Sequence, residues 1–304
     1  MSGGATPHDR VIAGGPNARD RVIASRDDLD ATLGWMASGH RMVFFAGLPG
    51  VGKSLYIREL ARAAHAIGRR VHSLQWDVAR PAFISPAIAT RYPDADGIAH
   101  PMVRKGVGQW VRQAVLRWSR ANADDSSLLI GELPLIGHRL VELVQIRADD
   151  LEPLLAGPQA LFATPVPSGT VRAAIERARQ RTLGNPSNPR ESEDAPVDVV
   201  QQSWAEIRAL AVDLGMAEPA PSENPPFDAD AYASVYRHLL RRRNALALRV
   251  EVELQQTASV YDHAVQVVDI VPSHAEADAI VARLERELTP SEIDAEVRRW
   301  AQSI

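Results

Sequence analysis

The sequence predicts an α/β fold built on a mostly parallel sheet. The chain has 304 residues, of which 45% are hydrophobic, so it can bury one large core or two modest ones. Short apolar runs, which suit strands buried on both faces, alternate along the chain with segments of helical periodicity. Because parallel strands need long connections that are usually helices, this alternation favours a doubly wound sheet.

The elements of this sheet are expected in order from residue 41. The run at 41–46 is apolar after its first residue and suits a buried strand. Apolar positions then recur at helical spacing as far as Ile67, and Gly68 suits the C-terminal cap of that helix. Further strands are expected at 71–76, 128–130 and 160–166, and further helices at 103–118, 137–147 and 169–182.

The alternation breaks at 184–198, a segment dense in Pro, Asn, Ser and acidic residues that is typical of a loop. Two capping boxes, one from Ser273 to Glu276 and one from Thr289 to Glu292, predict two closing helices. Between the loop and these helices we expect helices near 198–214 and 229–243 and strands near 246–254 and 265–271.

Composition and pattern divide the chain into four parts. Residues 1–25 lack periodicity and predict a flexible tail, and 26–183 form the core. Residues 184–245 are expected to form the edge of a lid and a helical insertion, and 246–304 to form strands and helices packed on the core. The absence of cysteine excludes disulfides and thiolate metal sites. No apolar stretch is long enough for a membrane span and no signal-like segment is found, so we expect a cytoplasmic protein without a membrane partner.

Arginine dominates the basic residues of this chain. Of its 34 basic residues, only Lys53 and Lys105 are lysines. An arginine-favouring genome explains the bias. Each retained lysine is therefore a candidate for a role that arginine performs badly.

A phosphate-binding motif follows the first predicted strand. It matches the pattern G-x-x-x-x-G-K-[ST] with Gly47, Leu48, Pro49, Gly50, Val51, Gly52, Lys53 and Ser54, and Leu55 comes next. The glycines let the backbone curl so that its N–H groups point at phosphate oxygens, and the following helix presents its positive end to the same anion. We therefore expect residues 47–55 to bind a nucleotide, with Lys53 on its β- and γ-phosphates and Ser54 on Mg²⁺.

The loop and the end of the second predicted strand resemble the P-loop kinases. The strand VHSLQW is followed by Asp77 and then by Arg80, which resembles the D-x-x-R of polynucleotide-kinase-like members of that family. The resemblance implies a three-layer α/β/α P-loop NTPase core with helical insertions and a C-terminal α extension. It also implies that Asp77 is the general base toward an acceptor hydroxyl and that Arg80 binds the acceptor. An ordinary ion pair at a strand end is the alternative explanation.

The third predicted strand ends in Gly131 and Glu132. In motor ATPases this strand ends in Asp-Glu, with the Asp on magnesium and the Glu on the attacking water. Gly131 in place of that Asp therefore favours a kinase. Glu132 is then expected to contact the substrate, or magnesium through water, and a purely structural carboxylate is the alternative.

Lid arginines follow the fourth predicted strand. Arg172 and Arg179 lie two turns apart on one helical face, and P-loop kinases carry such arginines to stabilise the phosphoryl group during transfer. A solvated basic helix face explains them equally well. In the kinase interpretation, 184–198 is the mobile edge of the lid.

The acceptor is expected to bind the long segment between the second and third strands, 78–126. Lys105 stands near a helix start there, where the helix dipole disfavours positive charge, so an anionic acceptor would explain it. A solvated helix start is the alternative. A basic cluster at 237–243 would suit nucleic acid, but the net charge of −4 does not favour such a partner.

Together these observations predict an ATP-dependent phosphotransferase. Lys53 and Ser54 would hold ATP·Mg, and Asp77 would take the proton of a hydroxyl acceptor. The absence of a guanine-reading N/T-K-x-D motif favours ATP over GTP. The alternative function is a regulatory ATPase or nucleotide switch that acts on a partner protein or nucleic acid, with Glu132 positioning water.

Overall fold

The computed structural model describes residues 19–304, except 96, 194, 220–221, 223–224 and 255–258. These residues form an α/β fold around a seven-stranded sheet in which all neighbouring strands are parallel. The order across the sheet is β1-β6-β5-β2-β4-β3-β7. The strands are β1 (Arg19–Ile23), β2 (Met42–Ala46), β3 (Arg70–Leu74), β4 (Ser127–Leu133), β5 (Ala160–Pro167), β6 (Ala245–Val250) and β7 (Val267–Asp269). The predicted α/β fold with a parallel sheet is confirmed.

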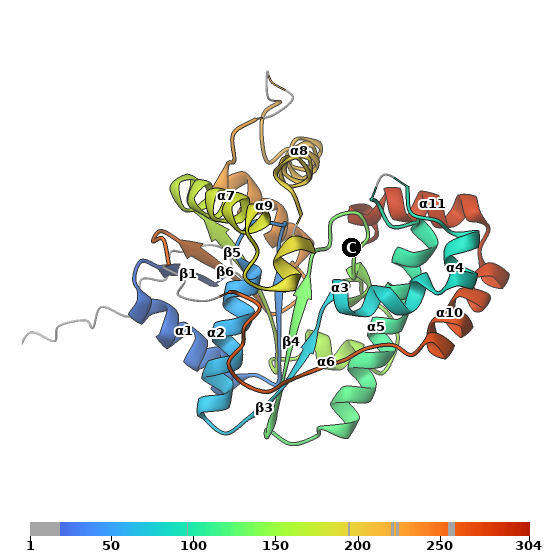
Figure 1. Cartoon of the computed structure of the whole chain (residues 1–304), viewed down its shortest axis with the longest axis horizontal. Coiled ribbons are helices and arrows are strands. Elements are labelled where there is room, and N and C mark those ends of the chain that lie inside the picture. Colours follow the sequence, from blue (N-terminus) through green and yellow to red (C-terminus); the bar gives the residue numbers. More distant parts are fainter. Residues whose placement is uncertain (1–18, 96, 194, 220–221, 223–224, 255–258) are drawn as a thin grey trace, which may run out of the picture.

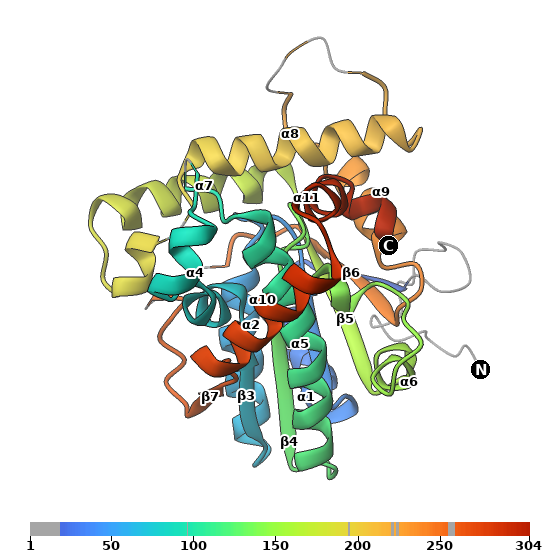
Figure 2. The ribbon, with the colours of Figure 1, turned by 90° about the vertical axis from the view of Figure 1, so that its right-hand side faces the viewer.

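Helices cover both faces of the sheet (Figure 1). On one face lie α1 (Arg26–Gly39) and α2 (Lys53–Ala66). The other face is covered by α5 (Pro101–Ala121) and α9 (Ala229–Leu239), and α10 (His274–Glu287) and α11 (Pro290–Arg298) pack against α5 (Figure 2). The remaining helices are α3 (Trp76–Ala79), α4 (Pro86–Arg91), α6 (Glu152–Ala156), α7 (Gly169–Gly184) and α8 (Val197–Asp213). Across the described residues, no helix combines the length and the apolar composition needed to cross a bilayer.

Two apolar cores lie on the two faces of the sheet, because β2 is buried on both sides. Phe44 points into one core and stacks on Phe162 of β5, with ring centroids 4.9 Å apart. Phe45 points into the other, where its ring centroid lies 5.9 Å from that of Tyr56 of α2. Side chains alternate between faces along a strand, so each position of β2 and its neighbours is committed to one side.

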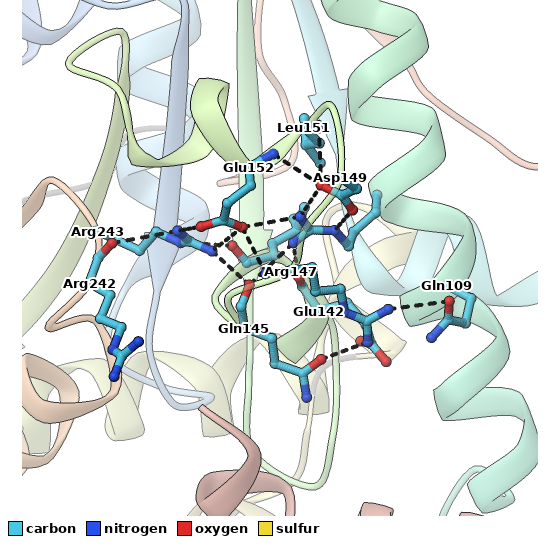
Figure 3. Close-up of polar contacts among 11 residues, drawn as sticks. Gln109, Glu142, Gln145, Arg147, Asp149, Leu151, Glu152, Arg242 and Arg243 are labelled. Atoms are coloured by element: carbon cyan, nitrogen blue, oxygen red, sulfur yellow. Dashed lines mark hydrogen bonds and ion pairs between the residues drawn. The ribbon is translucent and has the colours of Figure 1, made fainter.

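An ion-pair network around two buried arginines joins α5, the residues just before β6 and the segment between β4 and β5 (Figure 3). Arg243, whose side chain is fully buried, donates to Glu152 Oε1 at 2.5 Å and to the carbonyl of Gln145 at 2.8 Å. Arg112 of α5 donates to both carboxylate oxygens of Asp149, at 2.8 and 2.6 Å. Burial by itself would raise the pKa of Glu152, but hydrogen bonds from Arg243 and Arg112 hold it below its ordinary value.

The structure corrects four expectations. The tail expected over 1–25 is wrong for its described part, because β1 pairs with β6 there; residues 1–18 lie outside the described residues. The helix expected at 137–147 is replaced by a tight loop and a 3-10 turn at Val141–Leu143. The strands of 246–304 were expected to pack on the core. They are instead strands β6 and β7 of the central sheet. The basic cluster at 237–243 is not one basic surface, because Arg243 is buried in the ion-pair network.

Candidate functional site

A cleft of about 1940 Å³ lies at the carboxyl ends of β2, β3 and β4, with α7 and α8 along its opposite side. From β2 the chain first builds β3 and β4 on one side and then β5 and β6 on the other. Ligands of doubly wound sheets bind at such a switch point, where connections diverge. The residues that line the cleft beside β2 belong to the loop before α2 and to the start of α2 itself.

The loop between β2 and α2 presents unpaired backbone donors. Gly50 and Gly52 have φ values of 76° and 89°, a left-handed conformation that glycine adopts without a steric penalty. Among the described residues, the N–H groups of Gly50, Val51 and Gly52 have no hydrogen-bond partner, although Gly50 and Val51 are buried. Buried N–H groups are rarely left unpaired, and no side chain caps the N-terminus of α2. This row of donors is suited to bind an anion.

Lys53, the first residue of α2, is 5% exposed and points back into the loop. Its Nζ donates to the carbonyl of Leu48 at 2.8 Å and lies 3.2 Å from Glu132 Oε1 of β4. Burial lowers the pKa of Lys53, and the Glu132 carboxylate opposes that shift. The ammonium is therefore held beside the unpaired N–H groups by one backbone carbonyl and one carboxylate.

The next two residues of α2 differ in what they offer a ligand. The Ser54 hydroxyl lines the cleft and makes no hydrogen bond to a described residue. The N–H of Leu55 donates to the Gly52 carbonyl at 3.0 Å, so the first turn of the helix uses it. No cluster of three or more His, Cys, Asp and Glu side chains suited to a metal occurs in the described part of the chain. A cation here would therefore depend on Ser54 and on oxygens that a ligand brings.

Tyr232 of α9 supports the back of the loop. The N–H of Leu48 donates to its hydroxyl at 3.4 Å, and the Tyr232 ring packs against Tyr236, with centroids 4.7 Å apart. A Cβ atom on Gly47 would lie 2.6 Å from the same hydroxyl oxygen, which is closer than real Cβ contacts allow. The motif therefore needs glycine at position 47 because α9 fills the space behind it.

The end of β4 turns Glu132, and not residue 131, toward Lys53. Gly131 pairs with Phe44 in the sheet, and a Cβ atom on it would lie 2.3 Å from Phe44 Cδ1, inside the apolar core. Glu132 projects from the opposite face, and the next residue, Leu133, returns to the core and is fully buried. The carboxylate of this strand that faces the loop is therefore Glu132.

Asp77 follows β3 in the first turn of α3, and its side chain opens into the cleft. Partial desolvation by the cleft walls raises the pKa of Asp77, although its side chain stays open to solvent, and the nearby Glu132 carboxylate adds to the shift. The positive charges of Arg139, Lys53 and Arg80 oppose it. A cleft carboxylate with a raised pKa is a candidate proton acceptor.

Three arginines line the cleft on the side of α3. Arg80 pairs with Asp94, so the expected acceptor-binding residue already has a partner. Arg104 of α5 donates to the Ala99 carbonyl at 2.7 Å and to the Gly137 carbonyl at 3.0 Å. The third, Arg139, comes from the loop after β4.

The loop that carries Arg139 is strained. Leu135, His138 and Leu140 have φ values of 61°, 65° and 63°. A left-handed conformation costs an L-residue other than glycine about 1–2 kcal/mol. Fully buried His138 and Glu142 hold the loop through a contact of 2.9 Å between Nε2 and Oε1. This geometry replaces the expected helix and directs Arg139 into the cleft; strain of this kind clusters at functional sites.

The structure does not bring the two lid arginines together. Arg179 lines the cleft, donates to the Ala195 carbonyl at 3.0 Å and lies near enough to lower the pKa of Lys53. Arg172 is 4% exposed and lies outside the lining, with its guanidinium 4.9 Å from the centroid of the Phe227 ring. A Cβ atom built on Gly50 would lie 3.7 Å from the Arg172 Cζ, so this guanidinium is buried beside the loop between β2 and α2. Its contact with a transferring phosphoryl group stays a prediction.

Lys105 does not line the cleft either. It is 6% exposed, pairs with Glu296 of α11 and lies 3.9 Å from Glu142 Oε1. Helix α5 begins at Pro101 with His100 as its cap, so Lys105 stands in the second turn and inside the fold. Its predicted contact with an acceptor is wrong, because two carboxylates already neutralise its charge.

The chain was compared with protein-family models, curated proteins and solved structures. None matches. Its function therefore has to follow from the geometry of the cleft.

Two parts of the site lie outside the residues that the sequence singles out. Arg139 follows β4 closely, and loops at the carboxyl edge of a parallel sheet face the ligand, so this position carried a usable signal. No sequence signal indicated Tyr232, because this residue contacts Leu48 from 184 residues farther along the chain.

Proposed function

We propose that this chain is an ATP-dependent phosphotransferase of the P-loop kinase type, which moves the γ-phosphoryl group of ATP·Mg to a hydroxyl acceptor. The observation that carries the proposal is the row of unpaired N–H groups at 50–52 beside the buried Lys53 ammonium. Such a set of donors matches the oxygens of a polyphosphate, and few other ligands would satisfy all of its members.

The nucleotide would bind with its phosphates in the loop. Lys53 would then donate to phosphate oxygens in place of the Leu48 carbonyl. The unpartnered Ser54 hydroxyl and the Glu132 carboxylate are the oxygen donors that suit Mg²⁺, which neutralises phosphate charge when it is bound. The chain has no guanine-reading N/T-K-x-D motif, so ATP is the favoured nucleotide.

Asp77 is the residue suited to activate the acceptor. Its carboxylate would take the hydroxyl proton while the acceptor oxygen bonds to the γ-phosphorus and the bond to the β-phosphate oxygen breaks, which releases ADP. Lys53 and Arg179 would stabilise the charge that gathers on the phosphoryl oxygens. General bases of this kind contribute about 10²–10⁴-fold to the rate.

The end of β4 favours transfer to an acceptor over hydrolysis. A motor ATPase needs a magnesium-side carboxylate followed by one that activates water. Here Glu132 faces the loop and the next residue, Leu133, is buried in the core. Asp77 is a carboxylate of the cleft that comes from α3, directly after β3, and the segment 78–126 that follows it supplies Arg80 and Arg104 to the same wall.

The test follows labelled phosphate. The protein is incubated with ATP labelled at the γ-phosphate and with pooled hydroxyl acceptors: sugars, nucleosides and hydroxyl-ended oligonucleotides. We expect label on an acceptor, a rate about 10²–10⁴-fold lower for Asp77→Asn, and no change for Asp27→Asn on the exposed start of α1. Label found solely as inorganic phosphate, at a rate that Glu132→Gln abolishes and Asp77→Asn leaves intact, would establish the ATPase alternative instead.

A further inference from the structure

The cleft wall beside Asp77 is lined by three arginines that differ in how many partners they have. Arg80, Arg104 and Arg139 line it, from three different elements. Arg80 is paired with Asp94, and Arg104 is committed to two backbone carbonyls. The arginines are close enough for the charge of Arg139 to lower the pKa of Arg104.

Arg139 has no such commitment. Within the described residues its guanidinium makes no hydrogen bond or ion pair, and its Nε is buried without a partner. The nearby carboxylates of Asp77 and Glu206 attract it without bonding to it. An arginine presents five donors in one plane; Arg139 is partly exposed in the cleft, and leaving its buried Nε donor unpaired is costly. The group is therefore short of an acceptor.

The surroundings of Arg139 hold it in place for a ligand. Its Cζ lies 6.0 Å from the centroid of the Trp76 ring, so the indole packs beside the guanidinium and supplies no hydrogen-bond acceptor. The strained loop that carries it is fixed from below by His138 and Glu142 and from the side by Arg104, which bonds Gly137. A loop with a strained backbone therefore places this unpaired guanidinium in the cleft.

We propose that the acceptor of this site is itself an oxyanion, and that Arg139 binds its phosphate or carboxylate group beside Asp77. The proposal deepens the proposed function and rests on it, since it assigns Arg139 to the acceptor and not to ATP. A guanidinium binds either oxyanion with two parallel hydrogen bonds, and its contact with the acceptor would hold the hydroxyl near Asp77.

The test needs the phosphate-binding loop disabled, so it uses Lys53→Ala as the background. Inorganic phosphate and succinate are titrated separately by calorimetry into Lys53→Ala, into Lys53→Ala with Arg139→Gln, and into Lys53→Ala with Arg177→Gln. Arg177 is an exposed residue of α7, and its Nε bonds the carbonyl of Ala173 in its own helix. We expect at least one probe to bind, Arg139→Gln to weaken it tenfold or more, and Arg177→Gln to leave it unchanged.

The probe that binds more tightly identifies the group as phosphate or carboxylate. Binding of neither probe, or equal binding with and without Arg139, overturns the proposal. If the Lys53→Ala background does not fold, the wild-type protein is treated with phenylglyoxal and Arg139 is followed by peptide mass spectrometry. Protection of Arg139 by phosphate or succinate supports the proposal, and an unchanged labelling rate refutes it. A protein that binds these anions through Arg139 but does not bind ATP would refute the proposed function alone.

Discussion

Gly131→Asp restores the Asp-Glu ending that the sequence lacks, and the structure predicts that it destabilises the protein. A Cβ atom at this position would lie 2.3 Å from Phe44 Cδ1 and 2.8 Å from Cε1. The Phe44 ring cannot move away freely, because it stacks on Phe162 in a fully buried core. The added carboxyl group would enter that core and not the cleft.

Two contributions set the loss in free energy of unfolding that Gly131→Asp causes. Gly131→Ala adds one methyl group to a packed core, which costs about 1–3 kcal/mol, more than the roughly 0.5–1 kcal/mol that Ala gains over Gly in a strand. Gly131→Asp adds a buried polar group without a partner, at a further cost of about 1–3 kcal/mol. The net cost of about 1–5.5 kcal/mol is a large part of the roughly 5–15 kcal/mol that stabilises a typical domain.

Urea unfolding of the wild type and the two variants measures these free energies. Gly34→Asp is the control, because a Cβ atom on Gly34 in α1 meets nothing within 4 Å. We expect this control to stay within about 1 kcal/mol of the wild type. If Gly131→Asp were as stable as the wild type and bound ATP·Mg more tightly, residue 131 would face the cleft and the assignment of Glu132 to the loop side would be refuted.

Two further predictions concern charged groups. Because the pKa of Asp77 is raised in the folded protein, the folded state holds this proton more tightly than the unfolded state, and stability falls as pH rises from about 3.9 through the raised pKa. Asp77→Asn should therefore raise Tm at neutral pH and leave it unchanged below about pH 3.9; a lower Tm at pH 7 in thermal scans would contradict this. Arg243→Met should cost about 1.5–3 kcal/mol in urea unfolding, because it leaves the partly buried Glu152 without its closest partner, while Arg242→Met at the exposed neighbouring position should cost little. Equal costs for the two variants would show that the network does not stabilise the fold.

The sequence predicts the centre of the sheet well because burial on both faces leaves a simple signal. β2, β4 and β5 are apolar runs, and α2 and α5 repeat their apolar positions at helical spacing. β1 escapes this reasoning because RDRVI is mostly charged, and its pairing with β6 at the sheet edge is a long-range contact. The segment 137–147 has helical periodicity, but it forms a loop that is held by the contact of His138 with Glu142 and by the hydrogen bond from Arg104 of α5 to the Gly137 carbonyl.

The candidate site likewise has one part that the sequence predicts and one part that it does not. The residues of the loop between β2 and α2 are contiguous, so a motif contains nearly all of their geometry. The cleft wall on the side of α3 is assembled from separate segments. Helical spacing alone placed Arg172 with Arg179, because it could not show that Arg172 is buried against Phe227 while Arg179 lines the cleft. Lys105 is one of two lysines in the chain, which made it a candidate for a contact with the acceptor. The sequence could not show the two carboxylates that neutralise it, because they come from distant elements.

The most direct test of the central claim is equilibrium binding of ATP·Mg by calorimetry to the wild type and to Lys53→Ala, with circular dichroism to confirm that both are folded. Hydrogen bonds to charged groups contribute about 1.5–3 kcal/mol each, so the loss of one ammonium should weaken binding by about ten- to a hundredfold. The account predicts that the wild type binds one ATP and that folded Lys53→Ala binds it at least tenfold more weakly. No binding by the wild type, or an unchanged affinity in Lys53→Ala, would contradict it.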